Sequence, residues 1–205
     1  TTTEERRPFD ATIRIDVTLS PDHYQETFTI EIDRKTPPQP TLQVQFASPH
    51  SEGMRWFPAT NPQRTLKSTR SENGTGVLWI IEWPEPGEDN LKIIGEREPI
   101  RMEGDISLPL VRVNNATTQT GTVHLAASPA LSLSLNYTDP LTVTPIAHNE
   151  FGIISDERLA FRYNPLADIF AGAQPVVSTT IRPLQSLITV RDSTLTAYLG
   201  QTNVI

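Results

Sequence analysis

Apolar and polar residues alternate along most of this chain, and that two-residue period constrains the fold more than any other feature. Between residues 12 and 19 the apolar side chains are Ile13, Ile15, Val17 and Leu19, and every residue between them is polar. Such alternation is typical of a β-strand with one buried face and one face in water. The pattern recurs along the chain and predicts an all-β protein.

Prolines separate many of the alternating segments and argue against long helices. The chain has 18 prolines among its 205 residues, and proline both removes a backbone donor and clashes with the preceding helical turn. One short helix is predicted after Asn164-Pro165, ending at Gly172. About thirteen strands with turn signals between them favour an antiparallel β-sandwich.

Pairing between strands is predicted from neighbouring segments. We expect residues 13–19, 28–32 and 42–46 to form adjacent antiparallel strands with one wet face. Residues 77–83 are apolar on both faces, which indicates a central strand, and residues 91–95 are expected to be its hairpin partner.

Domain organisation is predicted from a break in the pattern near Met102–Gly104. It would divide the chain into two sandwich-like modules, residues 1–104 and 105–205, with one single large sandwich as the alternative. Residues 193–205 lack proline and charge and carry one apolar face. They are expected either to pair with a partner strand or second copy, or to be the last internal strand.

Composition excludes several classes of function. The net charge is −7 with no basic stripe, which argues against a nucleic-acid partner. No stretch approaches 18 apolar residues, so no membrane insertion is expected. The absence of cysteine removes disulfides, thiolate chemistry and cysteine-based zinc sites.

No catalytic motif is found, and we predict no catalytic residue, no metal site and no cofactor. The four histidines have no metal-ligand spacing, and Gly-x-Ser-x-Gly is absent. A hydrolase site assembled only in space stays open as an alternative, because a triad needs no local motif.

Two groups of carboxylates are candidates for chemistry. Paired carboxylates could hydrolyse glycosides, and a carboxylate cluster could bind Ca²⁺, but a solvated surface is the preferred interpretation of both groups. The first group lies on wet strand faces and the second on one hairpin: Asp16, Glu31 and Asp33, then Glu82, Glu85, Glu88 and Asp89.

Tryptophans could form a platform for stacking sugars. Trp79 and Trp83 share a face with apolar neighbours and are predicted to be core residues. Trp56 lies in an irregular segment beside Arg55, and two expectations stay open for it. It packs into the core with Met54 and Phe57, or it is the exposed tryptophan and forms the candidate ligand-binding site with Arg55.

Part of the chain resembles β-rich modules of very large, uncharacterised bacterial extracytoplasmic proteins. The resemblance covers Trp79–Gly95, Ile106–Leu110 and Gly121–Val123. It implies an exported, multidomain setting in the periplasm or at the cell surface and assigns no functional residue. The leading hypothesis is a non-catalytic structural or interaction module whose partner is protein, either adjacent modules or a second copy. A carbohydrate-binding module is the alternative.

Overall fold

The computed structural model describes most of the chain between residues 9 and 183, and every regular element in that part is a strand. The described residues are 9–33, 41–47, 53–73, 76–82, 90–102, 106–108, 110–114, 116–128, 131–137, 143–145, 157–166 and 177–183. The predicted all-β fold is confirmed. No helix able to cross a membrane is found among these residues.

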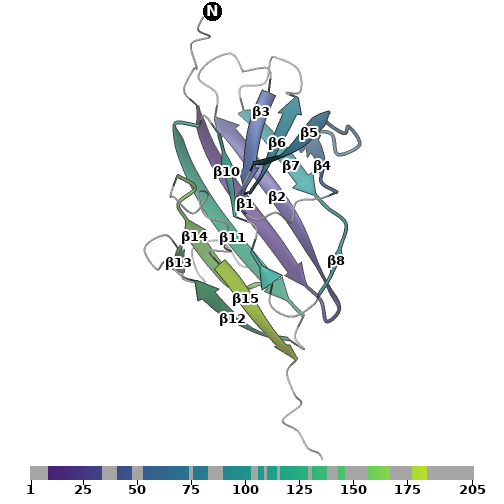
Figure 1. Ribbon diagram of the computed structural model, residues 1–205, viewed down its shortest axis with the longest axis vertical. Coiled ribbons are helices and arrows are strands. Elements are labelled where there is room, and N and C mark those ends of the chain that lie inside the picture. Colours follow the sequence, from purple (N-terminus) through teal and green to yellow (C-terminus); the bar gives the residue numbers. More distant parts are fainter. Residues whose placement is uncertain are drawn as a thin grey trace, which may run out of the picture.

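Fifteen strands form one eight-stranded, one four-stranded and one three-stranded sheet (Figure 1). In chain order they are β1 (Asp10–Leu19), β2 (His23–Asp33), β3 (Thr41–Phe46), β4 (Arg55–Pro58), β5 (Ser68–Asn73), β6 (Gly76–Glu82), β7 (Asn90–Glu96), β8 (Ile100–Arg101), β9 (Ile106–Ser107), β10 (Val111–Val113), β11 (Thr118–Ala127), β12 (Leu131–Tyr137), β13 (Val143–Pro145), β14 (Glu157–Tyr163) and β15 (Val177–Pro183).

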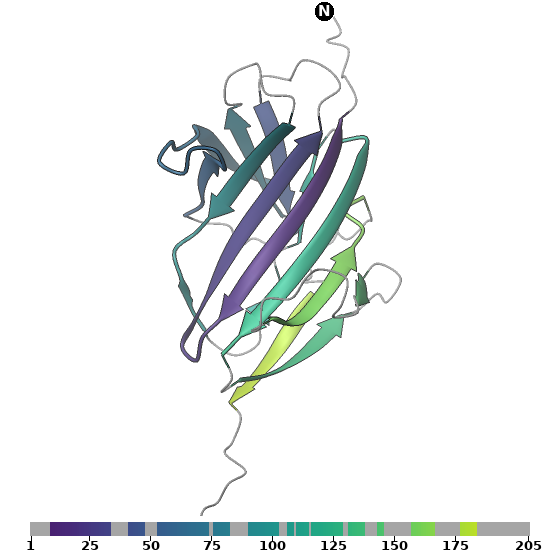
Figure 2. The ribbon, with the colours of Figure 1, turned by 180° about the vertical axis from the view of Figure 1, so that it is seen from behind.

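The eight-stranded sheet has the order β13-β14-β11-β1-β2-β7-β4, and β8 pairs with the free part of β2. Figure 2 shows β7, β2, β1, β11 and β14 side by side. Strands β1 and β2 are antiparallel, as alternation and a short turn predict. Strands β1 and β11 are parallel over ten residue pairs, which the antiparallel prediction did not include.

The four-stranded sheet, β10-β3-β6-β5, packs on the inner face of the large sheet. Aromatic side chains join the two: the ring of Phe28 lies 5.0 Å from that of Phe46, which also contacts Trp56. The core is one continuous cluster drawn from both sheets. Burying such a cluster is the main favourable term in folding.

Two pairing predictions are wrong for the same reason. Strand β3 does not continue the β1–β2 sheet but pairs with β6 and β10 in the other sheet. Strand β6 is central, as predicted, but its predicted partner β7 pairs instead with β2 and β4. The chain changes sheets at these connections, and alternation within a strand carries no information about that change.

The predicted module boundary near residue 104 does not separate two sheet systems. The parallel pair β1–β11 joins residues 10–19 to residues 118–127 within one sheet. The core cluster likewise contains residues from both sides of residue 104. The predicted helix after Asn164-Pro165 and the segment 193–205 lie outside the described residues, apart from a turn at residues 164–166.

Candidate functional site

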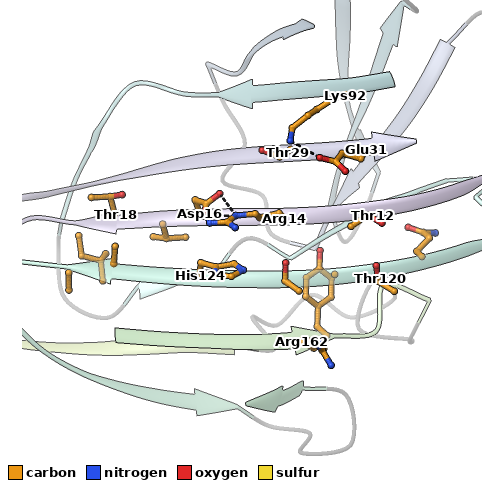
Figure 3. Close-up of a pocket in the computed structure, with 18 of the residues that line it drawn as sticks. Thr12, Arg14, Asp16, Thr18, Thr29, Glu31, Lys92, Thr120, His124 and Arg162 are labelled. Atoms are coloured by element: carbon orange, nitrogen blue, oxygen red, sulfur yellow. Dashed lines mark hydrogen bonds and ion pairs between the residues drawn. The ribbon is translucent and has the colours of Figure 1, made fainter. Parts of the chain in front are cut away.

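A polar trough lies on the outer face of the eight-stranded sheet, opposite the core. Its volume is about 1430 Å³, and strands β7, β2, β1, β11 and β14 all contribute to it (Figure 3). Apolar residues such as Val17, Leu19 and Ala126 also line it, but we call it the polar trough after its polar side chains, which include Thr12, Arg14, Asp16, Thr18, Thr29, Glu31, Lys92, Thr120, Thr122, His124 and Arg162.

Strand register places these side chains in rows across the sheet. Arg14 of β1 lies opposite Thr29 of β2 on one side and opposite Thr122 of β11 on the other. One step further along β1, Asp16 lies opposite His124. Neighbouring side chains of one face are close enough to interact across adjacent strands, so the rows form one continuous surface.

Two ion pairs fix two long side chains of the trough, Arg14 and Lys92. The guanidinium of Arg14 lies 2.7 Å from the Asp16 carboxylate, and its Nε donates to both carboxylate oxygens at 2.9 Å. The ammonium of Lys92 lies 2.6 Å from Glu31. Both pairs are partly exposed, so they add little to stability. Each ion pair instead holds a long, flexible side chain in a fixed position on the outer face of the sheet.

His124 is a member of the site that the sequence analysis did not select. Its side chain is 3% exposed although it lies on the polar side of β11. The signal was present in the sequence, because His124 continues the alternating series Thr118, Thr120 and Thr122. The other described histidine, His23, lies at the β1–β2 turn against Asp22.

The predicted exposure of Trp56 is wrong. The indole is 0% exposed and packs in the core against Phe46 and Trp79. It fits there because its cross-strand neighbour is Gly95, where even a Cβ atom would lie 2.5 Å from the ring. Trp56 therefore presents no surface on which a sugar could stack.

Arg55, the other predicted ligand-binding residue, points to the opposite side of the sheet from Trp56. Its guanidinium lies over the ring of Phe57 at 4.6 Å and 3.4 Å from Glu96. It does not line the polar trough. The structure thus separates the two residues that the sequence grouped, because adjacent residues of a strand face opposite ways.

Of the three carboxylates expected on wet faces, Asp16 and Glu31 line the trough but lie far apart, and Asp33, which is exposed at the end of β2, does not line it. Glu31 is opposite Thr12, four residues from Asp16 along β1, which corresponds to about 13 Å. Glycosidase carboxylates lie within about 10 Å of each other, so this pair does not fit that chemistry. Of the hairpin cluster only Glu82 is described, and it pairs with Lys67 at 2.6 Å.

No group of three or more His, Asp or Glu side chains that could hold a metal occurs among the described residues. A buried ion pair of Glu26 with Arg97, the one such pair among the described residues, lies on the inner face of the sheet and does not line the trough. The trough thus offers hydroxyls, paired charges and one buried imidazole.

Comparisons with solved structures give distant likenesses, of which we describe two. No family model and no curated protein matches the sequence. An M1 zinc metallopeptidase from Deinococcus radiodurans is 13% identical with a TM-score of 0.35, covering 87% of this chain and 43% of that one. Leukotriene A4 hydrolase from Saccharomyces cerevisiae is 8% identical with a TM-score of 0.41, covering 89% and 31%. The chain thus spans less than half the length of either protein, and likenesses this distant carry no argument about function.

Proposed function

We propose that this chain is a non-catalytic interaction module and that the polar trough is where a partner protein docks. The observation that carries the proposal is the size and continuity of the trough. At about 1430 Å³ it exceeds the range usual for small-molecule pockets, and it runs across five strands rather than closing around one point.

The side chains of the trough support a macromolecular partner. Threonine presents a methyl group and a hydroxyl on a stiff side chain, so it loses little rotamer freedom on docking. Arg14 and Lys92 are already held by Asp16 and Glu31, which lowers the entropy lost when a partner orders them. Mixed charges of this kind favour specificity of docking.

An adjacent module or a second copy is the partner class that we favour. The sequence resemblance to modules of large exported proteins supports the first of these. Carbohydrate binding through exposed aromatic residues is less well supported, because Trp56 is buried and no Trp, Tyr or Phe with a described side chain is exposed.

The absence of cysteine makes a direct test possible. Thr29→Cys places a single thiol in the trough, and Thr65→Cys places one on an exposed segment away from it. We expect the thiol at position 29 to react with a maleimide more slowly in the protein expressed from its natural gene than in the isolated chain, in proportion to the occupied fraction. The thiol at position 65 should react equally in both.

The trough would be excluded as a docking surface if the thiol at position 29 reacted at the same rate in both preparations and if that rate did not change with the concentration of the isolated chain. A glycan array with the isolated chain tests the other class of partner. Specific glycan binding that is lost in Arg14→Ala would replace the proposed function by carbohydrate recognition.

A further inference from the structure

Strands β10 and β4 lie at edges of the two large sheets and form hydrogen bonds along their outer edges. Strand β5 is also an edge strand, and no strand pairs with its outer edge within the described part of the chain. The outer edge of β10 is covered by side chains: the Tyr163 hydroxyl bonds the backbone of Val111, and the Gln119 amide bonds Val113 N–H and C=O at 2.8 and 2.7 Å. The β4 edge receives a backbone bond, from Leu66 N–H to Trp56 C=O at 2.7 Å.

Strand β5 ends the four-stranded sheet and has six residues in regular pairing with β6 (Figure 1). Within the part of the chain that the structure describes, no strand pairs with its outer edge. It contains neither proline nor a bulge, two of the devices that usually prevent an edge from recruiting another strand.

The direction of the backbone groups along β5 follows from one hydrogen bond. Glu82 N–H donates to Lys67 C=O at 2.8 Å, so residue 67 faces β6. Because the direction alternates along a strand, Ser68, Arg70 and Glu72 direct their backbone groups outward. An added strand would pair through these residues.

We propose that β5 pairs with β5 of a second copy, antiparallel about a twofold axis at Ser71. In this register Arg70 lies opposite Glu72 of the second copy, and Glu72 lies opposite its Arg70. Within one strand Arg70 already bonds Glu72 at 3.0 Å. The four side chains would therefore form a square in which each cation has two carboxylate neighbours.

The charges select this register over its neighbours. An axis at Arg70 would place two arginines directly opposite each other, and an axis at Glu72 would place two glutamates directly opposite each other. Like charges that face each other across two strands are destabilising. In the proposed register Arg70 and Glu72, whose backbone groups face outward, form the hydrogen-bonded pairs, so backbone hydrogen bonds and charge pairs agree. A C2 contact of this kind is the commonest symmetry of soluble oligomers.

A single cysteine at the axis tests the register. Ser71 and its copy would form a non-hydrogen-bonded pair with Cα atoms about 4.5 Å apart, within the range for a disulfide. The chain has no other cysteine, and Ser71 is exposed. We expect Ser71→Cys to form a disulfide-linked dimer under mild oxidation. Thr69→Cys, exposed on the same face of the same strand, lies opposite residue 73 and should not.

Charge exchange tests the pairing by sedimentation equilibrium. Arg70→Glu or Glu72→Arg alone should weaken the dimer at least about tenfold, because two attractive pairs become repulsive. The double variant Arg70→Glu/Glu72→Arg should restore the wild-type Kd within about threefold. A monomeric wild-type chain, or equal cross-linking of the two cysteine variants, would overturn the proposal. This pairing uses a different surface from the polar trough, so either idea can fail alone.

Discussion

At the residue scale, Tyr163 joins the two sheets of the sandwich. It belongs to the eight-stranded sheet, yet its hydroxyl donates to Val111 C=O at 2.6 Å and accepts from Val111 N–H at 3.3 Å in the other sheet. The ring reaches there over Gly121, where a Cβ atom would lie 2.4 Å from it. Burial raises the pKa of Tyr163, so the hydroxyl stays a donor at physiological pH.

Replacing Tyr163 by phenylalanine should therefore destabilise the fold without a steric change. The variant leaves both backbone groups of Val111 without their partner, which costs about 1 to 3 kcal/mol for buried polar groups. Urea unfolding of Tyr163→Phe, compared with the wild-type chain, measures the loss. A free energy of unfolding unchanged by Tyr163→Phe would show that the contact is not a stabilising one.

A second residue-scale feature is the buried pair of Glu26 and Arg97. Glu26 is 1% exposed, and its carboxylate lies 2.5 Å from the Arg97 guanidinium beside Tyr24. Burial raises the pKa of Glu26 from 4.5 to about 7, because loss of solvation outweighs the attraction of Arg97. The folded protein thus holds this proton more tightly than the unfolded chain.

Stability should fall as the pH rises through this interval. The contribution of Glu26 is fully present below about pH 4.5 and is lost by about pH 7, a change of about 3 kcal/mol. Glu26→Gln cannot ionise, so the difference in free energy of unfolding between wild type and Glu26→Gln should shift between pH 5 and pH 8. Glu31→Gln, from the exposed face of β2, is the control. A difference that stays constant with pH would contradict the assignment.

At the element scale, alternation predicts which face of a strand is buried but not which strands are neighbours. The odd residues from Ile13 to Leu19 are buried and the even residues between them line the trough, as the pattern indicates. The exposure of Trp56 could not be read in this way, because it depends on Gly95, a cross-strand neighbour 39 positions away. The trough itself depends on the β1–β11 register, a parallel contact between distant segments.

Glycine and a large aromatic ring oppose each other twice in this sheet, at Gly95 with Trp56 and at Gly121 with Tyr163. In each pair the ring covers the position that lacks a side chain. Aromatic residues packed over a cross-strand glycine stabilise strand pairs in this way. Both rings also contact the opposite sheet, Trp56 through Trp79 and Tyr163 through Val111. These pairs therefore position the two sheets relative to each other.

At the scale of the whole molecule, the two halves of the chain share both a sheet and a core. Strand β1 lies between β2, from the first half, and β11, from the second. Strand β10 adds Val111 and Val113 to the core that β3 and β6 build. Each half alone would expose apolar surface that the other half now covers, and that surface is the main source of folding free energy.

A fragment of residues 1–104 should consequently fail to fold alone. It lacks β11, so β1 loses its ten parallel partners and Ile15 and Val17 lose the neighbours Val123 and Leu125. We expect the intact chain to unfold in urea as one cooperative transition, as single domains do. The fragment should show no such transition and should be digested rapidly by a protease at low concentration.

The complementary fragment, residues 105–205, should behave in the same way, since its β11 and β10 have lost their partners β1 and β3. A cooperative transition in either fragment would instead restore residue 104 as a domain boundary and make the β1–β11 contact an interface between modules.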